Sequence, residues 1–173
     1  MISILFLAAD PTDAPRLRLS EEIREIQENL RRAKLGTQFE FHPRFSVRPT
    51  DISQALLDVS PQVVHFSGHG TSTGALYIEN RVGQTHPIDP ETLAALFELF
   101  AGDVNCVILN ACYSITQAQA IAKHIPYVIG MSEAIGDGAA VAFSDGFYRA
   151  LGAGRSIEEA YKLGCVQIRL EGI

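Results

Sequence analysis

The chain has 173 residues, of which 47% are hydrophobic, and this size and composition suit a single compact domain that can bury a full core without a metal or disulfides. Its net charge is −6, from 14 Lys and Arg against 20 Asp and Glu, and neither sign is concentrated in a block. A nucleic-acid groove and a membrane-binding patch are therefore not expected.

The first half of the chain alternates apolar runs with amphipathic segments. Residues 2–8 form an apolar run that predicts a buried strand. A helix is expected at residues 17–33, because its apolar residues recur at helical spacing; they are Leu19, Ile23, Ile26 and Leu30. A second strand is expected at residues 39–45, and a second helix at residues 51–59 with Ile52, Leu56 and Leu57 facing inward.

The second half continues the same alternation. A third strand is expected at residues 62–67, and a short β-ribbon at residues 75–78 and 83–88. Asp89-Pro90 predicts a helix that runs to residue 100, since proline is favoured in a first turn. The remaining strands are expected at residues 104–110 and 127–131, and the remaining helices at 118–123, 139–151 and 157–168. This order predicts an α/β fold with a mostly parallel sheet of about five to six strands and helices on both faces.

The cysteines and the chain start indicate the compartment. Cys106, Cys112 and Cys165 are an odd number without CxxC or Cys/His zinc spacing, so neither a disulfide framework nor a structural metal site is expected. The apolar run at residues 4–9 is too short to span a membrane and follows no basic region. We expect a cytoplasmic protein. Because the chain stops abruptly after a helix, we also expect the domain of residues 1–173 to be part of a longer polypeptide.

Reactive side chains follow two of the predicted core strands. His69 comes two residues after the third strand and Cys112 two residues after the fourth. Functional groups gather at the carboxyl ends of parallel strands, so the two are expected to be neighbours. An imidazole can take the proton of a thiol and return it to a leaving amine, which is the chemistry of amide hydrolysis. Gly68 is expected to let the backbone turn sharply, and Gly70 to leave room for a substrate carbonyl beside a backbone N–H.

Less specific interpretations exist for the same residue types. A histidine between two glycines can be a simple turn residue, and a free cysteine in an apolar stretch is usually a small core residue, which is our interpretation of Cys106 and Cys165. Cys112 differs because polar Asn110 and Ser114 flank it just past the strand end.

The other histidines lack a partner pattern. His65 lies inside the third strand and is interpreted as a buried imidazole. A zinc site built from His65 and His69 would need their spacing of four on a helix, so it is rejected. His42, His86 and His124 are assigned to the surface.

The two paired motifs bear a family resemblance. "VVHFSGHG" and "VILNACYS", with "YVIGMSEAIGDGAAVAFSDGFYRAL" downstream, resemble the CHAT peptidases, bacterial relatives of the caspases, metacaspases and separases. The similarity extends from "ILFLAADP" to "GRSIEEAY". Cys112 follows His69 by 43 residues, against about 50 for the caspase dyad. The resemblance implies a caspase-like three-layer α/β sandwich and a cysteine endopeptidase, that is, a thiol protease acting on a protein or peptide substrate.

The resemblance also implies roles for individual residues. By motif match, His69 is the general base and acid, Cys112 is the nucleophile, and the backbone N–H groups of Gly70 and Cys112 form the oxyanion hole. This chemistry needs no organic cofactor and no metal. Metacaspases can depend on calcium, but no cluster of carboxylates that would hold the ion is visible in the sequence.

Substrate preference is less defined by the motifs. Metacaspases carry Asp-Ser-Cys at the nucleophile, whereas this chain has Asn110-Ala111-Cys112, which leaves a preference for Arg or Lys in doubt. Asp137 falls where separases have an acidic pocket residue and can pair with a substrate Arg. Equally, Asp137 can cap the helix expected near residue 139. Glu133 and Asn110 complete the candidate substrate-binding residues.

Regulation is expected from the habit of the family. CHAT domains usually occur with a sensor or repeat domain that holds the protease inactive, often in defence against phage. We therefore expect a regulatory sensor domain or an activating partner protein. The alternative function is a non-catalytic caspase-like binding or scaffold module. A receiver domain is disfavoured, because the end of the first strand offers only Asp10 and Asp13 instead of a cluster of acids. A nucleotide-binding domain is disfavoured, because the segment Ala8-Ala9-Asp10-Pro11 offers no glycine-rich turn.

Overall fold

The computed structural model describes residues 1–173, which form two compact units, each built from separate stretches of the chain. Residues 2–17 and 41–134 form one unit, which we call the sheet unit. Residue 1 and residues 18–40 and 135–173 form the other, which we call the helical unit.

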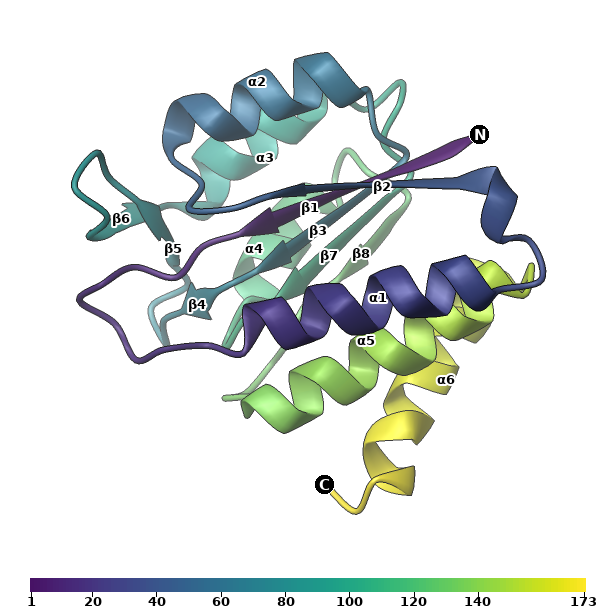
Figure 1. Ribbon diagram of the computed structural model, residues 1–173. Coiled ribbons are helices and arrows are strands. Elements are labelled where there is room, and N and C mark those ends of the chain that lie inside the picture. The colour runs from purple at the N-terminus through teal and green to yellow at the C-terminus, as the bar shows by residue number, and fades with distance from the viewer. The chain divides into compact units, whose positions relative to one another are not determined.

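The sheet unit is organised around a five-stranded sheet (Figure 1). Its strand order is β2-β1-β3-β7-β8, and β1, β3, β7 and β8 run parallel. The register sets Ser67 opposite both Ala8 and Asn110, so β1, β3 and β7 end at the same edge. The strands are β1 (Ile2–Ala8), β2 (Phe39–Arg44), β3 (Val63–Ser67), β7 (Cys106–Asn110) and β8 (Tyr127–Ile129).

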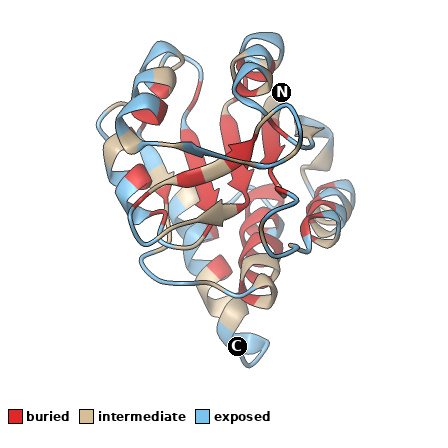
Figure 2. Ribbon diagram, turned by 90° about the vertical axis from the view of Figure 1, so that its left-hand side faces the viewer, coloured by how far each residue is buried: buried red, intermediate tan, exposed pale blue.

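The central strands are buried on both of their faces, as the red strands of Figure 2 show. Helices α2 (Pro49–Val59), α3 (Pro90–Leu99) and α4 (Ile115–Ile121) pack against one face. The core there joins Leu56, Phe97 and Ile121 from the helices to alternate strand residues such as Leu7, Phe66 and Leu109. Continuous apolar runs therefore mark strands covered on both sides.

The inward face of α2 differs by one residue from the prediction. Ile52 and Leu56 are buried as expected, but Leu57 is 63% exposed. Inward positions on a helix follow each other by three or four residues, so after Ile52 they fall on Ala55 and Leu56. The prediction for Leu57 was wrong because it ignored this spacing.

A second, antiparallel sheet follows β3. It consists of β4 (His69–Gly70), β5 (Leu76–Glu79) and β6 (Thr85–Ile88). The predicted ribbon of β5 and β6 is confirmed. Strand β4 was not predicted: His69 pairs with Tyr77, and Gly70 pairs with Leu76.

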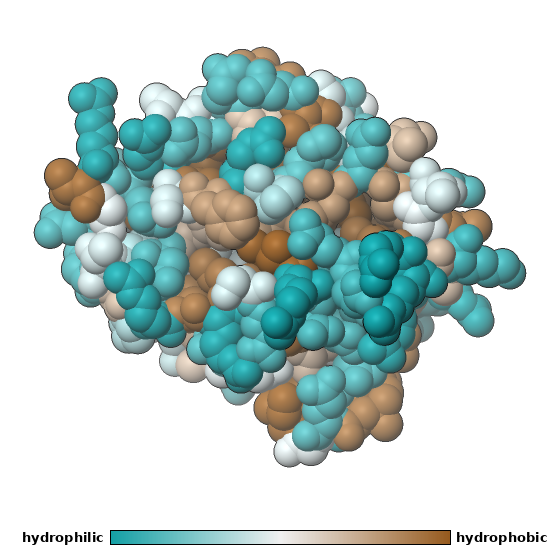
Figure 3. All heavy atoms as spheres, in the orientation of Figure 1, coloured by the Kyte–Doolittle hydropathy of each residue, from teal (hydrophilic) through white to brown (hydrophobic).

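The helical unit contains α1 (Leu19–Arg32), the 3₁₀ turn η1 (Gly36–Gln38), α5 (Asp137–Gly152) and α6 (Ile157–Leu170). Helix α5 packs against both α1 and α6. Gly146 of α5 and Gly164 of α6 allow the close approach, since a Cβ on Gly146 would lie 2.8 Å from the Leu163 carbonyl oxygen. The predicted inward residues of α1 are buried, and hydrophilic side chains cover its outer side (Figure 3).

The fold class is confirmed as α/β with a mostly parallel sheet flanked by helices. No helix of the chain is both long enough and apolar enough to cross a membrane.

Candidate active site

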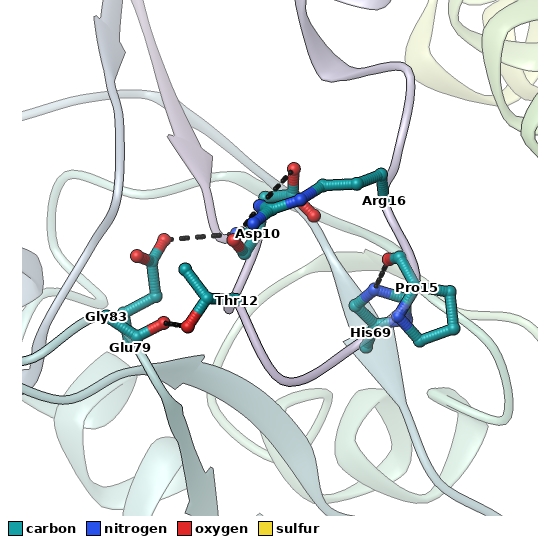
Figure 4. Close-up of polar contacts among 7 residues, drawn as sticks. All are labelled: Asp10, Thr12, Pro15, Arg16, His69, Glu79 and Gly83. Carbon is teal, nitrogen blue, oxygen red and sulfur yellow. Dashed lines mark hydrogen bonds and ion pairs between the residues drawn. The ribbon is translucent and has the colours of Figure 1, made fainter.

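A backbone carbonyl holds the imidazole of His69 (Figure 4). The Nε2 atom of His69 lies 2.7 Å from the carbonyl oxygen of Pro15. A carbonyl oxygen only accepts hydrogen bonds, so Nε2 carries the proton in this contact. In the neutral ring Nδ1 is then the nitrogen without a proton, and it is the atom able to act as a base.

The loop that supplies this carbonyl is tied to the small sheet. The backbone N–H of Thr12 donates to the Gly83 carbonyl at 2.8 Å, and the Thr12 hydroxyl donates to the same oxygen at 3.1 Å. The N–H of Asp10 donates to the Glu79 carboxylate at 3.1 Å (Figure 4). The loop of residues 10–16 is therefore anchored at the turn between β5 and β6.

Asp13 adds a third anchor to this loop. Its Oδ1 accepts from the backbone N–H of Thr85 at 2.8 Å and from the Thr85 hydroxyl at 2.7 Å. The hydroxyl contact lowers the pKa of the Asp13 carboxyl. Sequence reasoning missed this loop as part of the site. Its available signal was the pair Pro11 and Pro15, which restricts the backbone of a short segment.

The structure brings the backbones of Gly70 and Cys112 into contact. Cys112 comes two residues after the end of β7 and is half-buried. A Cβ placed on Gly70 would overlap the carbonyl oxygen of Cys112. The expectation that these two strand ends are neighbours therefore agrees with the structure. The roles of His69, Gly70 and Cys112 in catalysis stay predictions.

Close backbone packing requires both glycines, and the expected role of Gly70 beside a substrate carbonyl stays a prediction. Gly70 makes room for the Cys112 carbonyl of the chain itself. Gly68 is not in the left-handed region; a Cβ there would lie 2.8 Å from the Phe66 ring and 3.1 Å from the Ala9 carbonyl oxygen. Close packing at the end of β3, rather than a sharp turn, explains Gly68.

The loop after Cys112 is strained and strongly tethered. Tyr113 has φ 55°, a left-handed conformation that costs energy for a residue with a side chain. Its N–H donates to the Glu133 carbonyl at 3.1 Å, and the Ile115 N–H donates to the Met131 carbonyl at 2.9 Å. Buried Ser114 donates its hydroxyl to the Leu109 carbonyl at 2.9 Å and accepts from the Met131 N–H at 2.9 Å. Residues 131–133 thus hold the segment that follows the candidate nucleophile.

The other two cysteines are placed differently from Cys112. Cys106 is fully buried in β7, and burial raises the pKa of its thiol to about 12. Cys165 is half-buried on α6, where its hydrogen bond with Tyr161 raises the pKa of the Tyr161 hydroxyl. Cys106 is confirmed as a core residue.

The remaining histidines do not join His69. His65 is fully buried and stacks on Phe6 with ring centroids 4.7 Å apart, so its assignment as a buried imidazole is confirmed. His86 is exposed as expected, whereas His42 and His124 are half-buried. No group of three or more His, Cys, Asp or Glu side chains is arranged to hold a metal ion.

The candidate substrate-binding residues fall in different places. Glu133 is exposed, and its backbone lies next to Tyr113. Asp137 belongs to the helical unit, where it is the first residue of α5; the N-cap is Gly136, so the interpretation of Asp137 as the cap was wrong. Asn110 is only 3% exposed, and its carbonyl accepts from the Gly68 N–H at 3.4 Å. This burial leaves its side chain little surface for a substrate.

The fold and the paired strand ends define the class of caspase-like α/β proteins. A secreted C11 cysteine protease from Bacteroides thetaiotaomicron, solved with an irreversible peptide inhibitor, is similar with a TM-score of 0.63 and 13% identity over 94% of this chain and 57% of that one. Caspase-1 from Spodoptera frugiperda is similar with a TM-score of 0.63 and 15% identity over 98% of this chain and 77% of that one. These similarities confirm the caspase-like fold.

The family follows from the sequence match. The profile described as CHAT domain matches residues 7–168, and the chain belongs to this family. The predicted resemblance is confirmed. The chain is 25% identical over 92% of its length to a Roc-COR-CHAT protease of an unknown prokaryotic organism, and 26% identical over 96% to a Roc-COR-CHAT protease of Runella zeae. A probable protease of Gillisia limnaea is 25% identical over 86% of the chain. The match covers only 16% and 18% of the lengths of the two Roc-COR-CHAT proteases, in the order given, and 26% of the length of the Gillisia limnaea protein.

Proposed function

We propose that this chain is a cysteine endopeptidase domain that cleaves a partner protein, with Cys112 as the nucleophile and His69 as the general base and acid. The observation that carries the proposal is the contact between the backbones of Gly70 and Cys112, which sets the histidine-bearing β4 beside the end of β7. The names of the relatives, all proteases, and the caspase-like fold support it.

The proposed reaction has two stages, formation of a thioester on Cys112 and its hydrolysis, and His69 transfers the proton in both. Nδ1 of His69 takes the proton of the Cys112 thiol, and the thiolate sulfur forms a bond to the scissile carbonyl carbon. The N–H groups of Gly70 and Cys112 donate to the resulting oxyanion. As the C–N bond breaks, the imidazolium returns its proton to the leaving amine. Water, deprotonated by His69, then attacks the thioester, and Cys112 leaves as the thiol with the proton from His69.

The Pro15 carbonyl supplies the orientation that a carboxylate gives in other triads. Its hydrogen bond fixes the tautomer with Nδ1 free of a proton. Because the acceptor is a backbone atom, no side-chain substitution at residue 15 removes it directly.

Substrate preference is assigned to Glu133 first, because the backbone of this exposed acid adjoins the nucleophile loop. Asp137 and Asn110 are the further candidates. Cleavage of matched peptides with Arg or Ala before the scissile bond tests this assignment. Glu133→Gln is expected to reduce the preference for Arg at least tenfold, and an unchanged preference transfers the role to Asp137, tested by Asp137→Asn.

Control by a second domain or partner forms part of the proposal. The names of two relatives join Roc-COR to CHAT, and this chain matches less than a fifth of their lengths. We place the activity in a regulated bacterial signalling or defence system in the cytoplasm.

One experiment tests the activity, the target and the cut site together. Wild type and Cys112→Ala are incubated with the products of neighbouring genes, and fragments are identified by mass spectrometry. Discrete fragments that appear only with wild type support the proposal. If circular dichroism shows both proteins folded and neither yields fragments with any candidate partner, the chain is instead the non-catalytic binding module.

A further inference from the structure

A groove that is not lined by the candidate catalytic residues lies in the sheet unit. A cavity of about 610 Å³ is lined by α2, by the segment after β2 and by the turn between β5 and β6. A second cavity of about 290 Å³ adjoins it and shares Arg48, Asn80 and Arg81 with it. Volumes of a few hundred cubic ångströms are typical of sites that hold small ligands or short peptide segments.

Hydrogen bonds hold the walls of this groove. Val47 donates its N–H to the Ala8 carbonyl at 3.2 Å and accepts from the Glu79 N–H at 2.9 Å. In the turn between β5 and β6, the Asn80 side chain accepts from the N–H groups of Val82 and Gln84 at 3.0 and 2.9 Å. The groove is therefore built into the folded chain.

The backbone at the rim is strained. Ser46, which lines the larger cavity, has φ 51°. A left-handed conformation at a residue with a side chain is costly, and such strain concentrates at functional sites. Its neighbour Phe45 lines the same cavity and is 61% exposed.

The acids of the larger cavity already have partners. Asp51 forms a two-pronged contact with the Arg48 guanidinium at 2.9 and 3.2 Å. Asp58 accepts from Gln54 at 2.8 Å, and the Glu79 carboxylate accepts from the backbone of residue 10. These acids are therefore engaged within the chain.

The smaller cavity has no acid in its lining, which includes Arg48, Arg81 and His86. Arg81 is exposed, and its guanidinium makes no hydrogen bond or ion pair within the chain. The Arg81 guanidinium, a planar fork without an acceptor in the chain, matches a carboxylate geometrically and electrostatically, whereas the guanidinium of Arg48 is already paired with Asp51.

We infer that this groove binds an acidic peptide segment of a partner protein. A carboxylate of the segment pairs with Arg81, and an apolar neighbour packs on Phe45.

The groove is linked to His69 through the loop of residues 10–16. The turn that forms one wall is bonded to this loop at Glu79 and Gly83, and Pro15 of the loop holds the imidazole (Figure 4). A segment that fixes the turn also fixes the carbonyl that orients His69. This consequence rests on the proposed function: occupancy of the groove raises the rate of cleavage.

Binding is tested with the full chain carrying Cys112→Ala, so that the probe is not cut. The probe is a fluorescein-labelled hexapeptide of alternating Glu and Leu, and its twin has Gln in place of Glu. By anisotropy, the acidic peptide is expected to bind at least tenfold more tightly than the twin, and more weakly as salt is raised. Arg81→Glu is expected to weaken binding at least tenfold. Lys123→Glu, at an exposed site outside the groove, changes the net charge equally and is expected to have less than a twofold effect.

Other results would overturn the inference. The inference fails if the acidic peptide does not bind at millimolar concentration or if its Gln twin binds equally well. It also fails if Arg81→Glu and Lys123→Glu weaken peptide binding equally, or if a single-stranded oligonucleotide displaces the peptide at a lower concentration than unlabelled peptide does. A Lys-containing version of the peptide is expected to prefer Arg81→Glu over wild type. Because the binding measurement needs no peptidase activity, binding without any cleavage by wild type refutes only the proposed function. Cleavage that is unchanged by bound peptide refutes only the link to His69.

Discussion

Replacing Ser114 with Ala is expected to destabilise the protein and loosen the segment that follows Cys112. The Ser114 side chain is buried, and its single hydroxyl serves both the Leu109 carbonyl and the Met131 N–H. Leaving a buried polar group without a partner costs about 1–3 kcal/mol. The first contact is buried and the second partly buried, so the expected loss in free energy of unfolding is about 2–3 kcal/mol.

Urea denaturation followed by circular dichroism measures this loss, since the midpoint falls with stability at constant slope. Ser132→Ala is the matched control, because Ser132 is exposed in the neighbouring loop; it is expected to change stability by less than about 0.5 kcal/mol. The reasoning is refuted if the two variants are equally stable. Because Ser114→Ala also loosens the segment that follows Cys112, the same reasoning predicts slower alkylation of Cys112 in Ser114→Ala than in Ser132→Ala.

Two further predictions concern Gly70 and Cys106. Gly70→Ala is expected to reduce cleavage and Cys112 alkylation at least tenfold, because the new Cβ would overlap the Cys112 carbonyl. Gly102→Ala is the control: apart from its chain neighbours, nothing lies within 4 Å of the new Cβ, so both rates should stay unchanged. Equal activity of the two variants would argue against the contact. In the folded protein the Cys106 thiol has a pKa of about 12, whereas an ordinary thiol has a pKa near 9. The contribution of the buried, protonated thiol to stability is therefore complete below pH 9 and is lost as the pH rises toward 12. In urea denaturation, the stability of wild type relative to Cys106→Ala should therefore fall by about 1.4 kcal/mol per pH unit above 9, and parallel pH curves would contradict the buried thiol.

The order of strands and helices was predictable because buried parallel strands are continuous apolar runs. The first and last residues of these strands and helices were harder to predict. Strand β4 has only two residues and no pattern of its own, because it exists through pairing with β5. Helix α4 begins at Ile115, three residues before the predicted start at residue 118, where Ile115 and Thr116 are exposed and give no inward signal.

The candidate site was predictable as a meeting of two strand ends, but its supporting contacts were not. The carbonyl that holds His69 is a backbone atom 54 residues away, and no side-chain pattern marks it. Likewise, a sequence shows that Gly70 lacks a side chain but not that the Cys112 carbonyl occupies the space. The hydroxyl of Ser114 joins two loops only once the chain is folded.

The account depends on a thiol activated by the imidazole of His69. Alkylation by iodoacetamide, followed for each cysteine by mass spectrometry in folded wild type and His69→Gln, measures this directly. The account predicts that Cys112 reacts fastest of the three cysteines at pH 7 and slows at least tenfold in His69→Gln, while Cys165 is unaffected. A Cys112 that reacts no faster than Cys165, or whose rate is the same in His69→Gln, would contradict it.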